Sequence, residues 1–304
     1  MTIPYFGRLL CLSLAAFFVA HLVLTVLVRS ISGRAIAQAG SMCAREGAQL
    51  LFALRLAPAV VAAAIAGGLC APSYLWLEPD GATEQIGVGC LVAALMAAAC
   101  WIHGIARAAR AALRSSRYLR SCEQAIESDA PLLMLAGVFQ PRLVVSRGVR
   151  RALTSEQLAV AVRHERAHGN AHDNLKRLLV LLTPDALPFV RSLTGLERGW
   201  ARLAEWAADD RAVDGSRQRS LALAAALVRV ARMGASPPPR LATSLLGDGN
   251  DLSTRVERLL NGLTPGPRAT RPWPAIVLVV AVVALAVQPA TLVGVHRALE
   301  ALAH

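Results

Sequence analysis

Four long stretches without a charged side chain constrain this chain more than any other feature. They cover residues 9–28, 56–77, 85–106 and 272–295. A helix rises about 1.5 Å per residue, so about 20 apolar residues cross the roughly 30 Å hydrocarbon core of a bilayer. The chain is 55% hydrophobic and has a mean hydropathy of +0.47. That composition excludes an ordinary soluble enzyme, a disordered chain and a small disulfide scaffold, and it predicts four transmembrane helices.

The first stretch also raises the alternative of a cleaved signal peptide. Its apolar run is longer than the roughly 7–15 residues of such a segment, and no convincing A-x-A cleavage site follows directly. We therefore expect a retained helix.

Charges between the stretches predict the orientation. Residues 29–55 hold four arginines against one glutamate, and five arginines follow the third stretch between 107 and 120. Residues 78–84 hold three acidic side chains and no basic one. Since positively charged loops stay in the cytoplasm, we expect both termini outside and residues 107–271 inside. The chain is then a multi-pass protein of the bacterial inner membrane, with a membrane region over 1–106 and a last helix and short external tail over 272–304.

The net charge of +12 lies almost entirely in the predicted cytoplasmic region. Residues 107–271 contain 26 basic and 15 acidic side chains. Part of this excess is the positive-inside signal, and the rest is suited to anionic lipid headgroups or to an acidic partner. No nucleic-acid motif accompanies it and aromatic residues are sparse, so no direct nucleic-acid contact is expected.

The six cysteines predict no metal or redox site. No pair has the C-x-x-C spacing, and four of the six lie within the apolar stretches. We expect them to pack as small hydrophobic side chains without forming disulfides.

A short motif in the cytoplasmic region predicts metal chemistry. Thr154 and Gln157 have the spacing of a capping box, so a helix is expected to begin there. His164, Glu165 and His168 form H-E-x-x-H on that helix. The two histidines lie about 6 Å apart along one face and reach a single Zn²⁺, while Glu165 is placed to take a proton from the attacking water.

A second motif supplies the remaining ligand. Glu205 and Asp209 have the E-x-x-x-D spacing of metallopeptidases whose third zinc ligand is a glutamate on another helix. We expect Glu205 to bind zinc and Asp209 to hydrogen-bond the outer nitrogen of a ligand histidine. Asp173 is a candidate for the same supporting role, with an ordinary solvated aspartate as the alternative. His172 is a fourth possible ligand only if Gly169 bends the helix, because a straight helix places it about 12 Å from His164.

A short hairpin is expected over residues 132–146, where two apolar runs flank Gln140-Pro141-Arg142. Its edge either accepts an extended peptide by strand addition or merely covers the zinc helix.

Together these features resemble the BlaR/MecR-type membrane metallopeptidases. Three predicted spans precede the motifs and one follows them. The segments that carry the resemblance are Pro141–Ser146, which leads into His164–His168 with Asp173 behind it, then Glu205–Val213, and Arg255–Leu260.

The resemblance implies a mainly α membrane protein whose cytoplasmic domain, residues 107–271, is an α+β gluzincin-like zinc metallopeptidase. It also implies signalling by proteolysis of a polypeptide such as a BlaI/MecI-like repressor. The family's β-lactam sensors have a penicillin-binding domain after the last span, whereas about nine residues follow here. We therefore expect the signal to enter through the spans, the acidic loop or a partner.

Two other functions stay open. One is an HtpX-like quality-control protease, although its usual arrangement has two spans on each side of the catalytic domain. The other is a membrane signal transducer that binds a partner through the zinc fold without catalysis. The presence of Glu165 favours an enzyme, because a binding site has no use for a general base.

Overall fold

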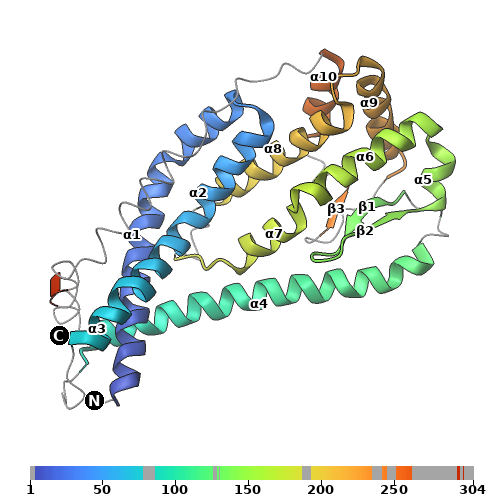
Figure 1. Ribbon diagram of the computed structural model, residues 1–304. Helices are drawn as coiled ribbons and strands as arrows, with labels where there is room; N and C mark the ends of the chain where they lie inside the picture. Colours follow the sequence, from blue (N-terminus) through green and yellow to red (C-terminus); the bar gives the residue numbers. More distant parts are fainter. Residues whose placement is uncertain are drawn as a thin grey trace.

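Helices make up most of the protein (Figure 1). The computed structural model describes residues 4–77, 86–125, 129, 131–186, 193–234, 242–244, 251–261, 293–294 and 297. The helices are α1 Tyr5–Ser41, α2 Ala44–Ile65, α3 Ala71–Leu77, α4 Val88–Ala125, α5 Arg147–Ala152, α6 Ser155–Ala171, α7 Asp173–Leu182, α8 Thr194–Val213, α9 Arg217–Arg232 and α10 Leu252–Asn261. A π-helical turn, Ala66–Cys70, joins α2 to α3. The strands are β1 Leu133–Ala136, β2 Arg142–Val145 and β3 Ala242–Ser244.

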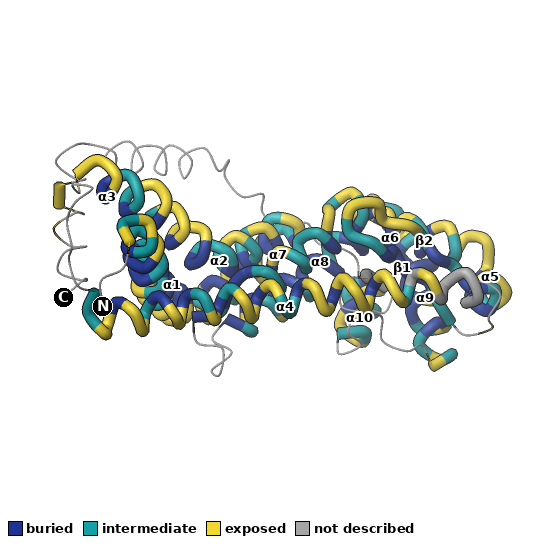
Figure 2. The backbone as a smooth tube through the Cα atoms, turned by 90° about the horizontal axis from the view of Figure 1, so that it is seen from below, coloured by how far each residue is buried: buried dark blue, intermediate teal, exposed yellow. Residues whose placement is uncertain are grey.

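Three of these helices are long and apolar enough to cross a membrane. They are Tyr5–Ser41, the continuous helix Ala44–Leu77, and Val88–Tyr118. Many of their residues are exposed (Figure 2). Large apolar residues are among them, as is normal for a surface that faces lipid. These helices contain the first two predicted spans and residues 88–106 of the third. The predicted fourth span, 272–295, and the acidic segment 78–84 lie outside the described residues, apart from residues 293–294.

The helices extend well beyond the predicted spans. Residues 29–55 were expected to form a loop, but α1 runs to Ser41 and α2 begins at Ala44. These extensions are helical because they pack against α8 in a shared core that includes Ala39, Leu51 and Leu203. Helix α4 likewise continues to Ala125. The arginines therefore mark where the uncharged surface ends, while the helices continue past them.

The predicted hairpin is confirmed as β1 and β2, which pair antiparallel with Leu135 opposite Leu143. The third strand was not predicted, because its three residues are too few to show an alternating pattern. It pairs with the other side of β1, in the sheet order β2-β1-β3. The two sides of β1 are therefore both paired, and only β2 and β3 have an outer edge.

The described cysteines are free thiols, in agreement with the sequence. Cys11, Cys70, Cys90 and Cys100 are buried, and the sulfurs of Cys11 and Cys90 lie 3.9 Å apart between α1 and α4.

An ion cluster joins the long helices to α8. Arg55 of α2 is 2% exposed, and it donates to Glu197 at the start of α8 at 2.7 Å and to Asp185 at 2.9 Å. Arg107 of α4 also pairs with Asp185, at 3.1 Å. Since several charges share these contacts with little water, the cluster fixes α8 relative to α2 and α4.

Close packing at Gly47 gives a prediction about stability. A Cβ atom there would lie 2.4 Å from the carbonyl oxygen of Ala39 and 3.0 Å from Leu203 Cδ1. We expect Gly47→Ala to lower the free energy of unfolding by about 1–3 kcal/mol, because α1 and α2 must separate. Gly33→Ala is the matched control, since nothing lies within 4 Å of its Cβ position. Thermal unfolding in detergent compares the two, and equal stability of both variants would contradict this packing.

Candidate metal centre

Helix α6 begins as the sequence predicts and places two histidines together. The Thr154 side chain accepts from the Gln157 amide, and the Gln157 side chain accepts from the Thr154 amide. Ten residues into the helix, His164 and His168 follow each other by one turn, and both are fully buried. Their Nε2 atoms lie 3.2 Å apart.

Glu205 of α8 completes the cluster. Its carboxylate oxygens lie 3.6 Å from the Nε2 atoms of His164 and His168. The three candidate ligand atoms lie within 4.8 Å of one another, and all three residues are buried. Two imidazoles and a carboxylate are a common donor set for zinc, so the residues present fit the ion that the sequence predicts. No other such group of three was found among the described residues.

Two further carboxylates hold the outer nitrogens of the histidines. Asp209 Oδ1 lies 2.9 Å from His164 Nδ1, and Asp173 Oδ2 lies 2.7 Å from His168 Nδ1. A neutral imidazole that donates from Nδ1 presents a lone pair at Nε2. Two such lone pairs and the Glu205 carboxylate facing one another repel, unless a cation or a proton lies between them.

The position of Asp173 follows from a turn at His172. The backbone there is left-handed, with φ at 56°, so α6 ends at Ala171 and α7 begins at Asp173. The turn brings the Asp173 carboxylate back to His168. The chain thus changes direction at His172, not at Gly169, and the exposed His172 lies outside the cluster of three ligands.

Arg255 of α10 is a functional residue that the sequence reasoning did not single out. It is 1% exposed and binds Asp209 with two hydrogen bonds, from Nε at 2.9 Å and from Nη2 at 2.7 Å. Its Nη1 lies 3.2 Å from Glu205 Oε2. One signal was present, since Arg255 follows Leu252 and precedes Val256 and Leu259 on the apolar side of a short helix. A charged residue in that position predicts a buried partner.

The buried charges shift the pKa values in opposite directions. Burial alone lowers the pKa of His168, but the carboxylates of Glu205 and Asp173 outweigh it and raise that pKa to about 10. Burial raises the pKa of Glu205, yet His168 and Arg255 hold it well below its usual range. The carboxylates therefore stay ionised and attract positive charge to the histidines. A metal ion there competes with protons for the same nitrogens.

Glu165 is buried beside the cluster and is tied to the sheet. Its Oε2 accepts a hydrogen bond from the Leu135 amide of β1 at 3.1 Å. Asn174 of α7 donates to the carbonyl oxygens of Leu135 and Gly137, at 3.1 and 2.8 Å. Two helices therefore hold the end of β1: α6 through Glu165 and α7 through Asn174.

No protein-family model matches this chain, and comparisons with curated proteins and with solved structures likewise gave no match. The resemblance to BlaR/MecR-type metallopeptidases therefore stays a prediction.

Replacing Arg255 tests the charge balance of the centre. We expect Arg255→Gln to lower the free energy of unfolding by about 3–5 kcal/mol, because Asp209 and Glu205 lose their buried cation. Arg258→Gln on the same helix is the matched control. Arg258 pairs with Asp210 but is 20% exposed, so its loss is expected to cost only about 1 kcal/mol. Thermal unfolding of both variants measures the difference, and equal losses would refute the role of Arg255.

Proposed function

We propose that this protein is a zinc-dependent membrane endopeptidase. The observation that supports it most is the convergence of His164, His168 and Glu205, with Glu165 on the same helix as the two histidines. These four residues have the types and the spacing that metal-assisted hydrolysis of a peptide bond requires.

The protein residues divide the work of the reaction. His164, His168 and Glu205 would hold a zinc ion, which would supply the Lewis acidity needed to acidify a water molecule and to polarise the scissile carbonyl. Glu165 takes the proton of the attacking water and passes it to the leaving amine. Asp209 and Asp173 keep the two imidazoles in the tautomer that offers Nε2, and Arg255 offsets the charge of Asp209 and Glu205.

We propose cytoplasmic or juxtamembrane polypeptides as substrates, in the manner of BlaR/MecR-type enzymes that lead to cleavage of a BlaI/MecI-like repressor. Support comes from the way α8, which holds Glu205, packs on the extensions of α1 and α2. A signal that moves the spans reaches the metal ligand through that contact. An HtpX-like protease would share the chemistry and differ in its substrates.

The substitution Glu165→Gln separates metal binding from catalysis. We expect the variant to keep its zinc, since Glu165 is not a ligand, and to lose cleavage by about 10²- to 10⁴-fold, because no base accepts the proton. Zinc content is measured by atomic absorption on the purified protein. Cleavage is measured by comparing new peptide termini in membranes that contain the wild type or the variant.

The matched control is Glu156→Gln, an exposed glutamate in the first turn of the same helix. It should leave both zinc and cleavage unchanged. Full proteolysis by Glu165→Gln would refute the mechanism, and a wild type that binds zinc without generating any new termini would favour the non-catalytic transducer.

We further propose that both termini face the outside of a bacterial inner membrane and that the metal centre is cytoplasmic. The arginines at 29–55 and at 107–120, opposed by the acidic side chains at 78–84, support this orientation.

Epitope tags test the orientation. A tag at residue 81 should bind antibody in intact spheroplasts, because it lies in the acidic segment. A tag at residue 238, in the predicted cytoplasmic region, should bind only after the membrane is permeabilised. The reverse pattern would invert the topology and place the metal centre outside.

A further inference from the structure

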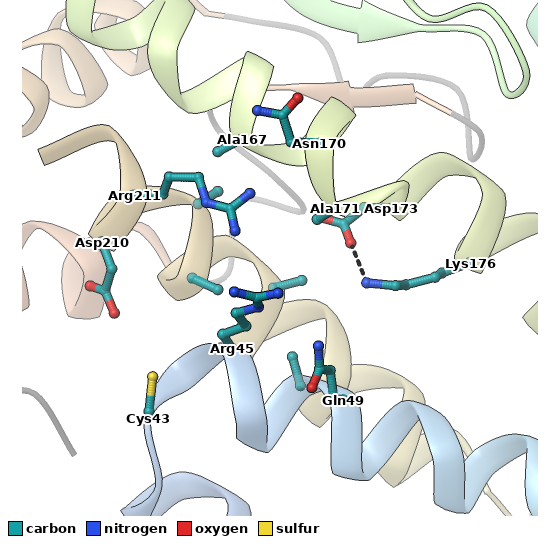
Figure 3. Close-up of a pocket in the computed structure, with 14 residues that line it drawn as sticks. Cys43, Arg45, Gln49, Ala167, Asn170, Ala171, Asp173, Lys176, Asp210 and Arg211 are labelled. Atoms are coloured by element: carbon teal, nitrogen blue, oxygen red, sulfur yellow. Dashed lines mark hydrogen bonds and ion pairs between the residues drawn. The ribbon is translucent and has the colours of Figure 1, made fainter. Parts of the chain in front are cut away.

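A cavity of about 500 Å³ lies beside the metal centre, between α2, α6, α7 and α8 (Figure 3). Small side chains form much of its lining, among them Ala48, Ala167, Ala204 and Ala208. Its volume is in the range of sites that bind small molecules. Asp173 lines the cavity and also contacts His168, so the cavity and the metal centre share a wall.

Basic side chains from three helices converge on this cavity. Arg45 of α2 and Arg211 of α8 extend into it with their guanidinium groups facing one another, and Lys176 of α7 lies at its side (Figure 3). Lys176 is paired with Asp173 at 3.2 Å. Neither Arg45 nor Arg211 has a hydrogen bond or ion pair with any residue that the structure describes.

The acidic side chains at the cavity are already engaged. Asp173 contacts His168 and Lys176, and Asp210 is bound to Arg258 by two contacts of 2.6 and 2.8 Å. No acidic side chain of the cavity is left to neutralise the two arginines. A positive charge of about two therefore lies in a small concave space. Arginine forks bind phosphate oxygens in pairs, and a phosphate dianion carries the matching charge.

The distance between the cavity and the membrane favours a ligand from the water phase. Arg45 precedes the uncharged stretch 56–77 by 11 residues, which is about 16 Å of helix. The headgroup layer is only about 5–8 Å thick on each side of the hydrocarbon core. A lipid phosphate at that layer lies nearer to Arg55 than to Arg45.

We propose that this cavity is a binding site for a phosphate-type dianion, held by Arg45 and Arg211, with the side-chain amides of Gln49 and Asn170 also in its lining. The ligand class is a small soluble phosphate compound. The site is independent of the peptidase proposal, because none of its arginines belongs to the metal centre.

The test uses the full chain in neutral detergent and inorganic phosphate as the probe, titrated at constant ionic strength. We expect saturable binding, measured by calorimetry and by a rise in the melting temperature. Arg45→Gln and Arg211→Gln should each weaken it about tenfold or more, because each removes a charged pair of donors. Both arginines are exposed, so the fold should tolerate the changes.

Arg198→Gln is the matched control, since Arg198 is an exposed arginine of α8 that does not line the cavity. It should change the affinity less than about twofold. Equal weakening by all three variants, or no saturable binding to the wild type, would overturn the site. A second arm repeats the titration in phosphatidylcholine nanodiscs with and without phosphatidic acid. Loss of phosphate binding in the acidic nanodiscs assigns the site to a lipid headgroup, and unchanged binding assigns it to a soluble phosphate.

Discussion

The candidate metal centre depends on one buried cation. Arg255 neutralises Asp209 and Glu205, which lie within a few ångströms of two fully buried histidines. Without a cation, carboxylates so far from water would take up protons, and the histidines would lose the acceptors that orient them. The guanidinium keeps them ionised and bridges them, so α10 is held to α8 and, through His164, to α6.

Ion pairs anchor helix α8 at two points along its length, one on each side of Glu205. Glu197 at its start is bound to Arg55 of α2, and Asp209 in its last turns is bound to Arg255 of α10. Glu205 lies between these two anchors. The same helix therefore holds Glu205 and contacts the long helices, and the close-packed apolar core around Leu51 and Leu203 joins it to them.

Local sequence signals predicted the local structure well. The capping box at Thr154 marked the first turn of α6, and the four-residue spacing of His164 and His168 was enough to place them on one face. The hairpin was also recognisable, because a turn tripeptide separates two apolar runs. Each of these features depends on neighbours a few residues away, so short-range geometry decides it.

Contacts between residues far apart in the sequence could be predicted only where a recognisable motif contained those residues. Strand β3 is too short to have a pattern, and it exists because β1 offers a second side to pair with. The helical extensions at 29–55 form because α8 covers them, whereas their charges alone suggested a loop. Arg255 sits some 50 residues beyond Glu205, and nothing near it in the sequence names Asp209 as its partner.

Side-chain type and helical period alone predicted the apolar membrane-spanning helices, three of which lie among the described residues, and a histidine pair spaced for a metal. The tertiary structure decided which histidine each predicted aspartate contacts, which arginine balances the carboxylates, and which arginines face the neighbouring cavity. These contacts join separate helices, and the packing of α6, α7, α8 and α10 brings their side chains within hydrogen-bond distance.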